Sequence, residues 1–218
     1  MLSPDLFHRA PGVPLLLAPE WLMLEDGPRQ GWAVAVQGGR FTQVAPLEEV
    51  RAAHPGAPVL DLPQRLLMPG LIDTHTHLTQ AFGKALAFGE PSEIFKRIWV
   101  PMEGVLDTHA AYLSSKLAAL EALRGGFTTV VDAGTRSEEG LAGVAQAARE
   151  AGIRCVLGMI CNDAGRAEGD EAGARRILDR AAAFLAELEH DPLIHPSLAI
   201  SIPEAATDRM LAGVAALT

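Results

Sequence analysis

The sequence predicts an α/β fold in which a series of βα units follows a segment of short strands. From residue 70 onward, apolar runs of strand length alternate with helical segments, which is the pattern of parallel βα units. Before that point, short apolar runs are separated by turns rich in glycine and proline, which is typical of antiparallel β structure. We therefore expect two parts, a small β domain over residues 1–66 and a βα domain over residues 67–218.

The N-terminal part contains a predicted hairpin. The pair Gly38-Gly39 favours a tight turn between strands over residues 31–37 and 40–44. Residues 21–24 are expected to form a further short strand.

The βα part is expected to hold four units. Each combines one apolar strand with the helix after it, and the strands are expected near residues 71–77, 127–133, 153–160 and 197–202. A glycine ends several of the intervening segments, as is common at the C-termini of helices. The sequence shows no repeat beyond this alternation.

Helices are expected between these strands. The first begins at Asp107 or Thr108, which are good N-capping residues, and carries four leucines close to one face, Leu113, Leu117, Leu120 and Leu123. Ser137 is expected to cap the next helix, and Gly152 to end it. A third helix is expected over residues 170–189.

Composition narrows the class of partner. Hydrophobic residues make up 49% of the chain and the net charge is −9, so a large core can form but no basic surface for nucleic acid or an anionic membrane is expected. No run approaches the ~20 apolar residues of a membrane span, and the N-terminus does not resemble a signal peptide. We expect a cytoplasmic protein whose partners are small molecules or another protein chain. Cys155 and Cys161 are expected as free thiols.

The segment from Asp73 to Leu78 carries the strongest candidate for chemistry. On a strand, alternate side chains share a face, so His75 and His77 point the same way. Two such imidazoles can provide two ligands of one zinc or iron ion. Taken alone, the pair also fits ordinary polar strand positions. A catalytic zinc ion takes three protein ligands and a water, so the pair is not a complete site.

The remaining histidines are not expected to be ligands. They lie in the β segment or before it, in the first turn of a helix, and around a predicted surface loop at Asp191-Pro192: His8, His54, His109, His190 and His195. The third ligand therefore has no candidate in this sequence.

Residues 67–77, which read LMPGLIDTHTH, resemble the first-strand signature of the amidohydrolase superfamily. The preceding β segment and the stretch LEALRGGFTTVVD over residues 120–132 are also similar to that superfamily. Residues 98–103, IWVPME, resemble its cytosine deaminase and chlorohydrolase branch. The resemblance covers about residues 13–217.

The resemblance implies a (β/α)8 TIM-like barrel with a β-sandwich domain built from both ends of the chain. It implies that His75 and His77 bind one divalent metal, zinc or iron, which activates a water molecule. The reaction implied is hydrolysis of a non-peptide C–N bond, most simply deamination of a small heterocyclic ring. Gln80 is then a candidate for substrate binding. Its alternative is a loop residue that holds the end of the strand.

The sequence departs from this family pattern in several ways. It holds only four of the eight units, since a full barrel takes about 250 residues. The later ligands and the proton shuttle of the family have no counterpart here, so catalytic residues remain unassigned. The fourth strand has no lysine, which favours a single metal. Glu204 at its end is a candidate for substrate binding, and Asp132 for support of the metal ligands, although an ordinary polar strand end fits both.

Two hypotheses follow from the incomplete barrel. In the first, the chain is the first half of an active hydrolase and is completed by further barrel strands, from a longer chain, a complementing chain or a homo-oligomer. In the second, it is a non-catalytic fragment or a structural subunit of a split amidohydrolase. Open edge strands favour pairing with further strands in either case.

Overall fold

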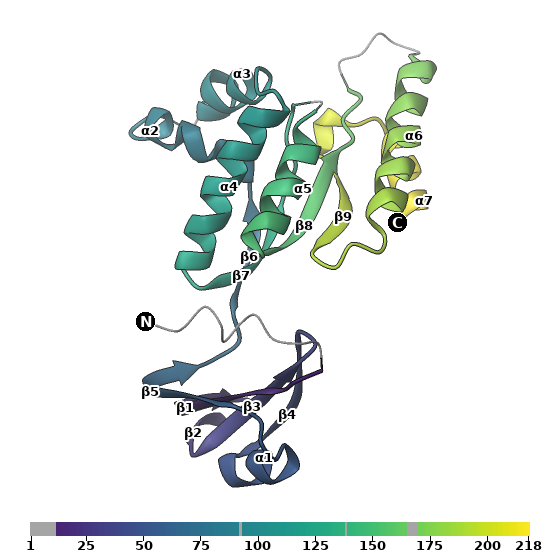
Figure 1. The fold of residues 1–218 in the computed structure, drawn as a ribbon. Helices are drawn as coiled ribbons and strands as arrows, with labels where there is room; N and C mark the ends of the chain where they lie inside the picture. The colour runs from purple at the N-terminus through teal and green to yellow at the C-terminus, as the bar shows by residue number, and fades with distance from the viewer. Residues whose placement is uncertain (1–11, 92, 138, 165–169) are drawn as a thin grey trace. The chain divides into compact units, whose positions relative to one another are not determined.

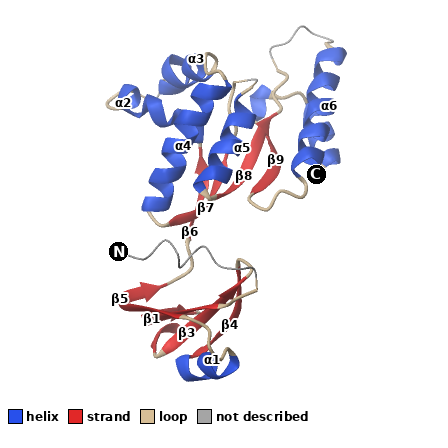
Figure 2. Ribbon diagram, in the orientation of Figure 1, coloured by secondary structure: helices blue, strands red, loops and turns tan. Residues whose placement is uncertain are grey.

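The computed structural model describes residues 12–91, 93–137, 139–164 and 170–218. The chain divides into two compact units, Met1–Pro69 and Gly70–Thr218. Figure 1 follows the chain through both units, and Figure 2 separates their helices from their strands. His8, which was not expected to be a ligand, lies outside the described residues.

The first unit is a five-stranded sheet with one helix. The strands run in the order β2-β1-β3-β4, and β5 pairs in parallel with β1. The predicted hairpin is confirmed, because Gly38 and Gly39 adopt positive φ angles of 58° and 75° between β3 and β4. The first strand is longer than the expected residues 21–24. The elements are β1 (Leu15–Leu24), β2 (Gly27–Gln30), β3 (Trp32–Gln37), β4 (Arg40–Pro46), α1 (Leu47–Ala53) and β5 (Val59–Leu67).

The second unit contains four parallel strands in the order β6-β7-β8-β9, as predicted for four βα units. Its strands are β6 (Leu71–Thr76), β7 (Phe127–Asp132), β8 (Arg154–Ile160) and β9 (Ile194–Ala199). The longer helices after them are α4 (Thr108–Arg124), α5 (Gly140–Ala151), α6 (Glu171–Leu188) and α7 (Asp208–Leu217). None of the helices among the described residues is both long enough and apolar enough to cross a membrane.

A run of short helical segments connects β6 to α4. These are the 3-10 helix η2 (Leu78–Gly83), α2 (Lys84–Ala87), the π-helical turn η3 (Phe95–Trp99) and α3 (Val100–Glu103). A further 3-10 helix, η4 (Pro203–Ala205), follows β9. These segments lie at the carboxyl ends of the strands, where barrel enzymes keep their functional residues.

Helices α4, α5 and α6 lie along one face of the parallel sheet (Figure 1). Their side chains join those of the strands in one core cluster, which includes Ala119, Val144, Ala148 and Leu188 with Val130, Cys155, Leu157 and Ile194. On β8, Cys155 and Leu157 are buried while Val156 and Ile160 are half-buried, because successive side chains point to opposite faces. The described residues thus cover the helix side of the sheet more fully than the other side.

The fourth strand begins three residues before the expected range. β9 starts at Ile194, which is fully buried and pairs with Cys155. The sequence predicts a surface loop at Asp191-Pro192 and the strand only from residue 197, but the strand extends back through Pro196. Among the described strands β9 pairs only with β8, and proline is tolerated in such an edge strand.

Of the four leucines expected on one face of α4, only Leu123 packs against the core. Leu113, Leu117 and Leu120 are 43%, 42% and 46% exposed. The buried residues of α4 are small, Ala111, Ser114, Ser115 and Ala119. The cause is a close approach to α5, where a Cβ atom on Gly143 would lie 2.5 Å from the Thr108 carbonyl oxygen. Large side chains cannot fit between backbones at that separation.

The predicted N-cap of α5 is also wrong. The helix begins after Glu139, whose side chain makes no capping hydrogen bond. Ser137 instead donates its hydroxyl to the Leu106 carbonyl, 2.6 Å away, and so ties this loop to the loop before α4. The end of α5 at Gly152 is as predicted, with a left-handed φ of 77°.

Candidate metal and substrate site

The two histidines lie at the carboxyl end of β6. His75 is an exposed residue of the strand, and His77 is the first residue after it, still extended at φ −130° and ψ 96°. Their ring centroids are 5.3 Å apart with the ring planes at 86°. Thr76 between them pairs with Asp132 of β7, so both imidazoles belong to the opposite face by alternation. The structure therefore brings the two candidate ligands together.

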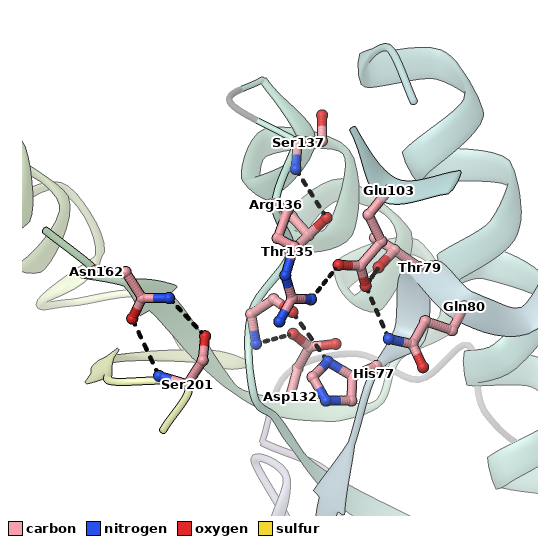
Figure 3. Close-up of polar contacts among 11 residues, drawn as sticks. His77, Thr79, Gln80, Glu103, Asp132, Thr135, Arg136, Ser137, Asn162 and Ser201 are labelled. Carbon is pink, nitrogen blue, oxygen red and sulfur yellow. Dashed lines mark hydrogen bonds and ion pairs between the residues drawn. The ribbon is translucent and has the colours of Figure 1, made fainter. Parts of the chain in front are cut away.

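Residues 132–134, at the end of β7, surround His77. Its Nδ1 atom lies 3.1 Å from the carbonyl oxygen of Gly134 (Figure 3). The Leu78 N–H donates to Asp132 Oδ2 at 2.7 Å, and the Ala133 N–H donates to the Thr76 carbonyl at 2.9 Å. The ring and both flanking peptides of His77 are thus held by one neighbouring segment.

Asp132 is almost completely buried, with 1% of its surface exposed. Its other oxygen accepts the Gly134 N–H at 2.8 Å. Burial raises the pKa of its carboxyl group, while the backbone donors of Leu78 and Gly134 and the neighbouring His77 act in the opposite direction. A side chain with two backbone donors organises the strand end, so Asp132 supports the segment that carries His77.

A polar cluster around Glu103, for which the sequence predicted no role, lies beside this segment. Glu103 at the end of α3 is completely buried. Its carboxylate accepts Arg136 Nη1 at 2.6 Å and Gln80 Nε2 at 2.9 Å (Figure 3), and the Thr79 hydroxyl at 3.3 Å. The Arg136 guanidinium also lies 4.4 Å from the centroid of the Phe95 ring. The cluster joins the loop after β6 to the loop after β7.

The two substrate-binding candidates differ in their surroundings. Gln80 is half-buried, and its amide nitrogen is held by Glu103. Gln80 and His77 both line a cavity of about 330 Å³, whose other walls include Asp73, Thr76, Trp99, Ala118 and Glu121. Glu204 is exposed in η4, and no hydrogen bond or ion pair joins it to the other described residues.

The described residues form no complete metal site. They contain no group of three or more His, Cys, Asp or Glu side chains that could hold a metal ion. His75 and His77 nevertheless fit two positions of one, because the rings are adjacent and the Gly134 carbonyl occupies only Nδ1 of His77. Among the residues that the structure describes, no other candidate joins this pair: His109 stacks on Tyr112, and both cysteines are buried thiols whose pKa is raised by desolvation.

Comparison with known families supports the fold. The model of the amidohydrolase family matches residues 66–218, and that of a bacterial imidazolonepropionase-like composite domain matches residues 33–57. A 5-methylthioadenosine/S-adenosylhomocysteine deaminase of Thermodesulfovibrio yellowstonii is 32% identical over 171 residues, which are 77% of this chain and 38% of the relative. A 5'-deoxyadenosine deaminase of Methanobrevibacter smithii is 38% identical over 106 residues, 47% of this chain and 23% of the relative.

Solved structures give the same result. An adenosine deaminase of Xanthomonas campestris with bound zinc superposes with a TM-score of 0.79 at 25% identity, over 93% of this chain and 46% of that one. A guanine deaminase of C. acetobutylicum with bound guanine has a TM-score of 0.77 at 14% identity, over 94% and 50%, which shows the fold alone. The chain spans about half the length of these structures. Its four parallel βα units are therefore part of a barrel, and the chain belongs to the amidohydrolase family.

Proposed function

We propose that this chain is the first half of a metal-dependent hydrolase that deaminates a heterocyclic ring by cleaving a non-peptide C–N bond. One observation carries the proposal: two adjacent imidazoles, His75 and His77, lie at the carboxyl end of the first strand of an amidohydrolase-family barrel. Active sites of such barrels lie at that end of the strands. The similar proteins named above are deaminases of adenosine-type compounds and of guanine, which favours a purine-like ring as substrate.

The proposed metal is one divalent ion, zinc or iron, held here by His75 and His77. When bound, such an ion lowers the pKa of a water molecule and polarises the reacting bond. The residues of this chain hold the two ligands and present polar groups to the substrate. Gln80 and Glu204 are the proposed substrate contacts. The buried Glu103 limits the rotamers of Gln80 by accepting its amide hydrogen.

The rest of the site is proposed to come from four further βα units. Residues 67–218 would be the first half of the barrel, and residues 1–66 the N-terminal part of a β-sandwich domain. Two features support a completing half: β6 and β9 each pair on one side only among the described strands, and α4 exposes Leu113, Leu117 and Leu120. Unpaired edges and apolar stripes favour burial against further structure. The proposed location is the cytoplasm, where buried free thiols stay reduced.

A second candidate is a non-catalytic fragment or a structural subunit of a split enzyme. The observation that favours it is the lack of a third potential metal ligand near His75 among the described residues. Since a catalytic zinc ion needs three protein ligands, this chain binds metal tightly only with its completing half. The two candidates therefore differ in what the completed protein does.

Metal analysis of the completed protein tests the proposal. Roughly one zinc or iron ion per chain is expected, together with ammonia release from a panel of adenosine-type compounds and guanine. His75→Ala should lose both. His195→Ala is the matched control, because His195 is also an exposed strand histidine but lies on β9. A completed protein without metal, or one whose metal survives His75→Ala, would support the second candidate.

A further inference from the structure

The ring of His77 is held by a residue that lies 57 positions later in the sequence. Nδ1 of His77 is 3.1 Å from the Gly134 carbonyl oxygen. A carbonyl oxygen only accepts hydrogen bonds, so Nδ1 must carry the proton. In the neutral ring this leaves Nε2 without a proton and with a free electron pair. The contact therefore selects the tautomer whose other nitrogen can bind a metal.

The Gly134 carbonyl is aimed by the local backbone. Gly134 has a φ of 89°, a region that favours glycine. A Cβ atom at this position would lie 2.5 Å from the Gly158 carbonyl oxygen of β8 and 2.9 Å from a side-chain carbon of Ile160. A Cβ atom on Gly158 would in turn lie 2.8 Å from the Asp132 carbonyl oxygen. Both glycines are required for the end of β7 to lie this close to β8.

Asp132 ties the same loop to the strand that carries His77. One carboxylate oxygen accepts the Gly134 N–H at 2.8 Å, and the other accepts the Leu78 N–H at 2.7 Å. These bonds fix the peptide that precedes Gly134 and the peptide that follows His77. Both ends of the contact between His77 and Gly134 are therefore set by one buried side chain.

We propose that Asp132 and Gly134 are positioning residues, which set the Nδ1–H tautomer and the ring orientation of His77 so that Nε2 is presented to the metal. The Nδ1–H tautomer is inferred from the geometry alone, whereas metal binding by Nε2 rests on the proposed function. Histidines that bind metals usually donate their other ring hydrogen to an oxygen of this kind, and loss of that partner costs about 10–100-fold in metal affinity.

Nitrogen NMR of the metal-free protein tests the tautomer directly, because protonated and bare imidazole nitrogens resonate in separate ranges. The His77 signals, assigned with His77→Gln, should show the proton on Nδ1. In Gly134→Ala and Asp132→Asn the population should shift toward the Nε2–H form that a free histidine side chain prefers. Zinc titration of the completed protein should show an affinity lower by about 10–100-fold in both variants.

Matched controls separate positioning from general damage. Gly152→Ala imposes the same left-handed strain at φ 77°, in open space at the end of α5. Asp163→Asn perturbs another buried strand-end aspartate, which accepts the Thr207 N–H at 2.7 Å and does not contact His77. Both controls should keep the His77 tautomer. If Gly134→Ala unfolds, the His77 tautomer can still be measured in Asp132→Asn and in the unmodified protein.

The outcomes distinguish this proposal from the proposed function. A proton on Nε2 of His77 in the unmodified protein would overturn the positioning role, whether or not metal binds. A tautomer that is unchanged in both positioning variants would overturn it as well. The Nδ1–H form in a completed protein that binds no zinc or iron would uphold the tautomer and reject the metal function.

Discussion

Replacing Arg136 with leucine should destabilise the protein far more than removal of an exposed ion pair would. The Arg136 guanidinium is 17% exposed, and its partner Glu103 is fully buried. The variant would leave the Glu103 carboxylate with only the neutral donors of Gln80 and Thr79. A buried charge without its partner is costly, because water no longer solvates it.

The expected loss is about 3–5 kcal/mol, the range found when one partner of a buried ion pair is removed. Loss of the contact between Arg136 and the Phe95 ring adds up to about 1 kcal/mol. The matched control is Arg97→Leu. Arg97 and Glu90 are also 2.6 Å apart, but their side chains are 53% and 32% exposed, so the expected cost is at most about 1 kcal/mol.

Urea unfolding followed by circular dichroism measures both variants. Because folded proteins are stable by only about 5–15 kcal/mol, Arg136→Leu alone can unfold this protein. In that case the double variant Arg136→Leu/Glu103→Leu tests whether the unpaired buried charge is the cause. Removal of both charges should restore much of the lost stability, since an apolar pair leaves no buried charge. The reasoning is refuted if Arg136→Leu costs no more than Arg97→Leu, or if the double variant is less stable than the single one.

Three further predictions concern other parts of the second unit, Gly70–Thr218. Asp107→Ala should cost about 1 kcal/mol in urea unfolding, because Asp107 accepts the Ala110 N–H at the start of α4; an unchanged midpoint would contradict the cap. Thiol reagents should modify Cys155 and Cys161 at least ~100-fold more slowly in the native protein than in urea, since both are buried and their thiol pKa values are raised; comparable rates would contradict this. The Glu150 carboxyl should titrate by NMR with a pKa of about 2, lowered first by its hydrogen bond to Lys116, and Lys116→Met should raise that value. Because the folded pKa lies below the ordinary value of 4.5, this stabilisation is present above pH 4.5 and is lost as the pH falls towards 2; an unchanged titration in Lys116→Met would show that Lys116 is not the cause.

Much of the secondary structure could be predicted from local pattern. The first three parallel strands and the end of α5 at Gly152 lie where alternation and capping residues indicated. The fourth strand began earlier than expected, because a strand with only one neighbour tolerates Pro196. The leucine stripe of α4 was identified, but its environment was not. That environment depends on how closely α5 approaches, and the approach is set by Gly143 in another helix.

The sequence by itself determined the alternation of strands and helices, the adjacency of His75 and His77, and the family, because these depend on spacing within a few residues. Only the tertiary structure decided that Gly134 holds the His77 ring and that Glu103 joins Gln80 to Arg136. The partners in these contacts lie 23 to 57 positions apart. Periodicity tells which way a side chain points from its own strand or helix. Strand register and close packing then decide which distant group it meets.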